Sequence, residues 1–146
     1  MDEKILALGA QTPRIHCAPP ARYAMREQDY GMTIGVAVTR GGRLFACWVG
    51  GGDNPKAYFL LSYSDDAGMT WSEPCLAIDP HDPSLPYSRC TIVGTLWVDP
   101  LNRLWLFFNS RSSSFISCRL LSPTPSPAAS RASVNRQAHC KKRRWL

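Results

Sequence analysis

Apolar and β-branched residues recur in short runs through the middle of the chain, and glycine, proline or aspartate bounds each run. The first four runs are 33–39 (TIGVAVT), 43–49 (RLFACWV), 56–63 (KAYFLLSY) and 71–78 (WSEPCLAI). The first two are joined by Arg40-Gly41-Gly42, which is typical of a β-hairpin turn. The pattern therefore predicts four antiparallel strands that form one small sheet over residues 33–78.

A second hairpin of the same kind follows a proline-rich segment, 79–87 (DPHDPSLPY), which we predict to be a loop. Its two strand-like runs are 92–98 (IVGTLWV) and 103–109 (RLWLFFN). At an offset of 60 residues the two hairpins align, Val38 with Val98, Arg43 with Arg103, Leu44 with Leu104, Phe45 with Trp105 and Trp48 with Phe108. This internal repeat predicts a second, partial copy of the same structural unit.

The loop between the third and fourth predicted strands carries the most specific motif of the chain. It reads S-x-D-x-G-x-T-W, with Ser64, Asp66, Gly68, Thr70 and Trp71 at the fixed positions. We expect Asp66 to accept hydrogen bonds from backbone N–H groups downstream, and Gly68 to take a positive φ. Thr70 adds a second hydroxyl to the loop, and Trp71 is expected to place its ring in the core.

This octapeptide resembles the Asp box of sialidase-type β-propellers, and residues 30–109 as a whole resemble the BNR-repeat sialidase-like proteins. The resemblance implies an all-β fold, here a fragment of a six-bladed sialidase-type β-propeller. We expect an irregular N-terminal segment at 1–31 and propeller blades at 32–109, one complete and one partial. A basic, Ser/Pro-rich tail follows at 110–146. In the family the box lies on the face away from the active site, so it implies a fold and not a catalytic role.

The charge of the chain changes at the same boundary as its hydrophobic pattern. Residues 1–109 hold nine Lys/Arg and eleven Asp/Glu, a net charge of −2, whereas residues 110–146 hold eight Lys/Arg and no acidic residue. Such a composition buries too little apolar surface to fold, so we predict a disordered tail. Because a propeller needs several blades, we expect the chain to be a truncated or frame-shifted remnant of a larger one. The basic run Lys141–Arg144 could bind phosphate or direct localisation, but without a folded nucleic-acid module no nucleic-acid partner is expected.

The resemblance implies a glycoside hydrolase that removes terminal sugars from glycoconjugates, with a carbohydrate partner and with no cofactor or metal. Asp53 follows the second predicted strand and approximates the family's acid/base position, so it is the candidate catalytic residue. Arg89 precedes the second blade, on the side where active-site loops gather, and is the candidate substrate-binding residue. The simpler interpretations are an ordinary turn for Asp53 and a solvated loop arginine for Arg89. The family's tyrosine–glutamate nucleophile would lie in later blades, so the isolated chain is expected to be inactive.

The alternative is a non-catalytic carbohydrate-binding or protein-interaction propeller. It is favoured because the first-blade arginines that hold a sugar carboxylate in sialidases have no counterpart here. The polar stretch at Arg22–Asp29 is a further candidate for lining the same site. His81 and Asp82 form a candidate polar pair, which a proline-rich loop explains equally well.

The cysteines and the N-terminus do not change the predicted fold or function. Six cysteines occur with no C-x-x-C pair, so neither structural zinc nor a disulfide framework has support from their spacing. Cys47 and Cys75 lie in apolar runs, where each thiol is predicted to behave as a small buried apolar side chain. No signal peptide or membrane-spanning run is visible, so no membrane partner is expected. As written, the chain is predicted to be cytoplasmic.

Overall fold

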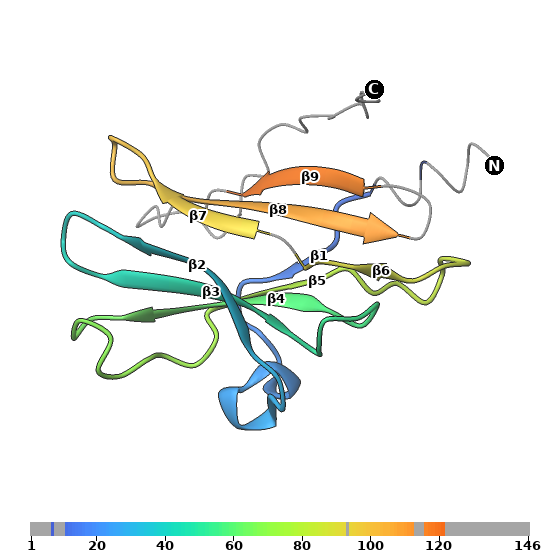
Figure 1. Ribbon diagram of the computed structural model, residues 1–146, viewed down its shortest axis with the longest axis horizontal. Helices are drawn as coiled ribbons and strands as arrows, with labels where there is room; N and C mark the ends of the chain where they lie inside the picture. Colours follow the sequence, from blue (N-terminus) through green and yellow to red (C-terminus); the bar gives the residue numbers. More distant parts are fainter. Residues whose placement is uncertain (1–6, 8–10, 93, 113–115, 122–146) are drawn as a thin grey trace.

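The computed structural model describes residues 7, 11–92, 94–112 and 116–121, which form two antiparallel sheets (Figure 1). The first sheet has the strand order β1-β5-β4-β3-β2, and in the second sheet β8 pairs with β6, β7 and β9. The strands are β1 (Arg14–His16), β2 (Met32–Val38), β3 (Leu44–Gly50), β4 (Tyr58–Ser64), β5 (Leu76–Asp79), β6 (Arg89–Cys90), β7 (Gly94–Val98), β8 (Leu104–Ser112) and β9 (Ile116–Leu121). The prediction of an all-β chain is confirmed at this level.

The predicted internal repeat is confirmed by the register of the two hairpins. Val38 pairs with Leu44 in the β2–β3 hairpin, and Val98 pairs with Leu104 in the β7–β8 hairpin. Each turn has its left-handed residue at the same place, Gly42 with φ 85° and Asn102 with φ 62°. The turns also touch, because the backbone N–H of Arg40 donates to Asn102 Oδ1 at 2.8 Å. The two copies therefore lie side by side in the same orientation.

The main hydrophobic core lies between the two sheets. Its buried residues are Cys47, Val49, Ala57, Phe59, Leu61, Leu76, Ile78, Cys90, Leu96, Leu104, Leu106 and Phe108. The rings of Phe59 and Phe108 meet edge to face across the sheets, with centroids 6.2 Å apart. Gly35 of β2 allows the backbones of the two sheets to approach closely, because a Cβ there would lie only 3.0 Å from the backbone nitrogen of Leu96 in β7.

The other face of the first sheet is covered in part by the chain that precedes β2. Two short 3₁₀ turns, Ala21–Tyr23 and Met25–Glu27, cross this face below the sheet in Figure 1. The buried Tyr23 side chain packs there with Trp48, Leu60 and Ala77. This second, smaller cluster fixes the segment against the sheet.

Three predicted boundaries differ from the structure. The fourth strand was expected from residue 71, but β5 begins at Leu76, because Pro74 has no N–H to donate to the neighbouring strand. The strand pattern was expected to end at residue 109, but β8 continues to Ser112 and β9 pairs with it. The segment 1–31, expected to be irregular, contains β1, which pairs with β5, and both 3₁₀ turns. The predicted disorder of 122–146 lies outside the described residues.

Candidate functional site

The Asp-box loop forms the hydrogen bonds that its sequence predicts. Asp66 Oδ1 accepts the backbone N–H of Thr70 at 2.9 Å, and Oδ2 accepts the Thr70 hydroxyl at 2.5 Å. Ser64 Oγ donates to Asp66 Oδ1 at 2.7 Å and accepts the N–H of Gly68 at 2.8 Å. Gly68 has φ 90°, as expected. The hydrogen bonds from the Thr70 hydroxyl, the Thr70 N–H and Ser64 lower the pKa of Asp66 to about 2.

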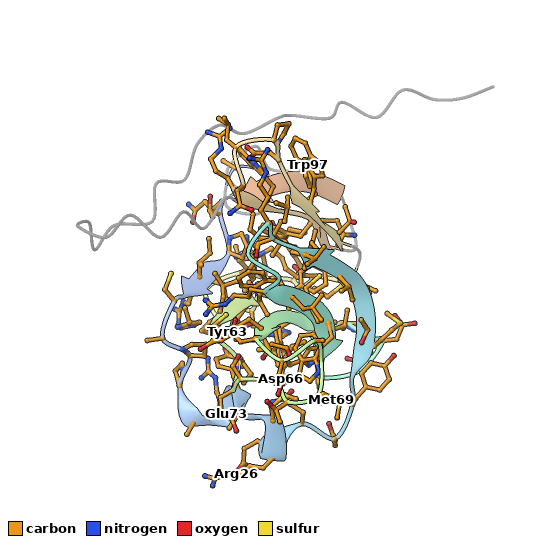
Figure 2. All side chains as sticks on the ribbon, turned by 90° about the vertical axis from the view of Figure 1, so that its left-hand side faces the viewer. Arg26, Tyr63, Asp66, Met69, Glu73 and Trp97 are labelled. Carbon is orange, nitrogen blue, oxygen red and sulfur yellow. The ribbon has the colours of Figure 1, made fainter. Side chains whose placement is uncertain are left out.

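The prediction for Trp71 is wrong, because its side chain is 39% exposed and lies outside the core. The chain does not enter β5 until Leu76, so residue 71 is still in the loop beyond the sheet. Its ring lies over the loop, near the place that a Cβ on Gly68 would occupy. Figure 2 views this end of the molecule directly and shows Asp66 and Met69 close together in the loop.

The candidate site residues lie at the opposite end of the first sheet from the box. In the β3–β4 pair, Leu44 is opposite Ser64 at the box end and Gly50 is opposite Tyr58 at the other end. The loops 51–57 and 80–88 both lie at this second end, on the right of Figure 1. We call it the loop end. The predicted separation of the box from the candidate residues is therefore seen in the structure.

Asp53 and Arg89 have different environments at the loop end. Asp53 is exposed, and within the described ranges its carboxylate has no hydrogen bond or ion pair. Arg89 is buried, and its guanidinium donates to the carbonyls of Pro80 and Gln11, each at 3.0 Å. Burial lowers the pKa of Arg89. The two residues are not paired, and Arg89 holds loop backbone where sequence reasoning expected contact with a substrate.

A polar cluster at the same end was only partly expected from the sequence. It consists of Arg22, Tyr23, Asp79 and His81. The Tyr23 hydroxyl donates to Asp79 Oδ2 at 2.6 Å and accepts from the Arg22 guanidinium at 2.7 Å. His81 Nδ1 lies 2.6 Å from Asp79 Oδ1, and its backbone N–H donates to the same oxygen at 2.9 Å. The predicted pair of His81 with Asp82 is therefore wrong.

The electrostatics of this cluster follow from those contacts. Burial opposes ionisation of Asp79, but the hydrogen bonds from His81 and Tyr23 outweigh it and hold the pKa of Asp79 below its usual range. Burial, together with the hydrogen bond to Asp79, raises the pKa of Tyr23 to about 12. The hydrogen bond to Asp79 raises the pKa of His81. Because Pro55 O faces His81 Nε2 at 3.2 Å, both ring nitrogens meet acceptors, which favours the doubly protonated imidazolium.

The contacts of this cluster connect the 3₁₀ segment, the end of β5 and the 51–57 loop, which is a structural role and not a catalytic one. Both oxygens of Asp79 are occupied by donors, one from each side, and His81 also reaches the 51–57 loop. The Arg22 and His81 side chains remain partly open to solvent. The cluster can therefore present positive charge and N–H donors to a hydroxyl-rich or anionic ligand, while its carboxylate is already satisfied.

A cavity of about 330 Å³ adjoins this cluster at Tyr23 and lies between the 3₁₀ segment and the chain that leads into β5. It is lined by Pro19, Pro20, Ala21, Tyr23, Ala24, Arg26, Glu73 and Pro74. Glu73 accepts the backbone N–H of Met25 at 2.8 Å, which ties the two walls together. Neither Asp53 nor Arg89 lines this cavity.

Comparisons with protein-family models, with curated proteins and with solved structures each find no match to this chain. In the part of the chain that the structure describes, no group of three or more His, Cys, Asp or Glu side chains is arranged to hold a metal ion. The described helices are all too short to cross a membrane. Cys17, Cys47, Cys75 and Cys90 are free thiols. The Cys47 side chain is fully buried, as predicted, whereas Cys75 is only partly buried, because it lies in the segment just before β5 begins.

Proposed function

We propose that this chain is a two-blade segment of a sialidase-type β-propeller whose loop end binds the terminal sugars of glycoconjugates without hydrolysing them. The observation that carries the propeller assignment is the set of hydrogen bonds that joins Ser64, Asp66 and Thr70 in the box loop. It is supported by two hairpins packed side by side, whose registers match from the turn as far as Gly35–Cys47 and Thr95–Phe107. An Asp box on each blade and radial repetition of such units would define a propeller of this class.

Binding is favoured over hydrolysis by the state of the two candidate residues. Glycoside hydrolysis in most families uses two groups that flank the scissile bond, one as acid/base and one as nucleophile or base. Asp53 stands without a partner among the described residues, and the guanidinium of Arg89 is turned to backbone carbonyls. The loop end does offer the exposed carboxylate of Asp53 and the largely exposed guanidinium of Arg22, which suit sugar hydroxyls.

The test is titration of the isotopically labelled chain with a panel of methyl glycosides, followed by amide chemical-shift mapping. We expect shifts at residues 51–57 and near His81, with none in the box loop. Asp53→Asn should weaken binding at least several-fold, whereas the matched control Met69→Ala at the box end should leave it unchanged. Binding that maps to the cavity beside Glu73, or no binding to any glycoside, would contradict the proposal.

Hydrolysis is the second candidate, and one observation favours it. Asp53 is an exposed carboxylate in a glycine-rich loop at the end of the blade away from the box, which is where an acid/base group is expected to lie. Release of the fluorophore from a panel of 4-methylumbelliferyl glycosides tests this candidate. Turnover that Asp53→Asn abolishes would replace the binding proposal, and turnover that survives the substitution would remove Asp53 from the mechanism.

A further inference from the structure

The two outer faces of the sheet pair carry exposed apolar side chains. On the second sheet, Trp97 is 49% exposed and Phe107 is 39% exposed. On the first sheet, Val36 is 57% exposed and Val38 is 55% exposed. Figure 2 shows Trp97 on the far side of the second sheet from the first sheet. Soluble chains seldom leave a large apolar patch at each end of a stack of sheets without a partner.

The internal repeat identifies what each outer face is built to contact. The residues of the second sheet that pack on the first sheet include Leu96 and Leu106. With the 60-residue offset of the repeat, the equivalent residues in the first sheet are Val36 and Ala46. The outer face of the first sheet is thus the repeat equivalent of a face that packs on a preceding sheet. In the same way Ala37 and Cys47, which face the second sheet, correspond to the exposed Trp97 and Phe107. That outer face is the equivalent of one that packs on a following sheet.

We propose that a second copy of the chain stacks on the first, with the Val36/Val38 face of one copy on the Trp97/Phe107 face of the other. This contact continues the sheet-to-sheet interface that already exists inside each chain. Tyr23 covers only the part of the first face around Trp48, so the part that bears the two valines stays open. The sizes are complementary, since large rings on one face meet small side chains on the other.

A head-to-tail contact accounts for both patches with one interface. A symmetric dimer through the Trp97/Phe107 face alone would leave the valine face uncovered. Head-to-tail contacts repeat from copy to copy and form a ring if the rotation closes. This stacking contact follows from the repeat and from the packing of the two sheets, and it does not require sugar binding.

The test is sedimentation velocity of the full chain over a range of concentrations, with one lysine substitution on each face. We expect the wild type to exceed the 16.3 kDa of one chain as concentration rises. Trp97→Lys and Val38→Lys should each be monomeric when alone. An equimolar mixture of the two should form a heterodimer that grows no further, because each variant keeps the face that the other has lost. Met69→Lys, an exposed apolar residue away from both faces, is the matched control and should associate like the wild type.

Three results would overturn the proposal. The first is a wild type that remains monomeric at every concentration. The second is a Val38→Lys variant that still self-associates while Trp97→Lys does not, which would indicate the symmetric contact. The third is dissociation by Met69→Lys, which would indicate non-specific association. If either variant fails to show a cooperative melting transition, Phe107→Lys and Val36→Lys replace the pair on the same two faces.

Discussion

Replacing Phe59 with alanine tests the packing of the two sheets most severely. Phe59 is fully buried on β4, and its ring meets Phe108 of β8 edge to face at 6.2 Å and 87°. Truncation of a buried phenylalanine costs about 3–5 kcal/mol, from lost transfer free energy and from the cavity that remains. Small domains have only about 5–15 kcal/mol of stability. We therefore expect Phe59→Ala to remove a large fraction of the free energy of unfolding.

The assay is urea unfolding monitored by tryptophan fluorescence at a low protein concentration, with the free energy extrapolated linearly to water. The double-mutant cycle of Phe59→Ala with Phe108→Ala isolates the ring pair, which is expected to contribute about 0.5–1.5 kcal/mol. Phe107→Ala is the matched control, because Phe107 directly precedes Phe108 in β8 and points to the opposite, exposed face of the sheet. Its cost should be below about 1 kcal/mol. A Phe59→Ala cost no larger than that of Phe107→Ala, together with zero coupling to Phe108, would refute the face-to-face packing.

Three further predictions concern the box and the polar cluster. The pKa of Asp66 is about 2 in the folded chain against an ordinary 3.8, so its stabilising contribution is present above pH 3.8 and is lost as pH falls toward 2. Asp66→Asn should therefore reduce the pH dependence of the free energy of unfolding in that range, and an unchanged pH dependence would contradict this. The pKa of His81 is raised above 6.5 by Asp79, so its contribution to stability is present below pH 6.5 and is lost as pH rises through the raised value. NMR titration of the imidazole should show that the pKa of His81 falls toward 6.5 in Asp79→Asn, and an unchanged pKa would exclude Asp79 as the cause. Gly68→Ala should destabilise the chain by more than about 1 kcal/mol in urea unfolding, because φ is 90° there, and a neutral or stabilising result would place that backbone in another conformation.

Local features of the fold were predictable because short-range chemistry determines them. The turns at Gly42 and Asn102 follow from a glycine or asparagine that tolerates left-handed backbone, between two β-branched or aromatic runs. The hydrogen bonds of Asp66 join groups within four residues of each other, so spacing alone indicates them. The offset of 60 between hairpins was visible because each copy keeps the same turn position.

Features that depend on long-range contacts were not predictable in this way. The partner of Tyr23 is Asp79, 56 residues away, and no local pattern links them. Arg89 reads as a solvated loop arginine until the fold brings the carbonyls of Pro80 and Gln11 around it. β9 was missed because its apolar run is short and lies between Ser- and Arg-rich residues, and its strand conformation depends on pairing with β8. Trp71 was misplaced because the box sequence does not say where the next strand begins.

The nuclear Overhauser contact between Gly35 and Leu96 tests the central claim that two repeated units pack face to face. A Cβ at Gly35 would lie 3.0 Å from the Leu96 nitrogen and 3.3 Å from the Thr95 Cα, so the Gly35 α protons must lie close to the Leu96 amide proton. We predict a strong cross-peak between these protons, in addition to the cross-strand peaks within each hairpin. Cross-peaks within both hairpins, but none between Gly35 and residues 95–96, would contradict the account.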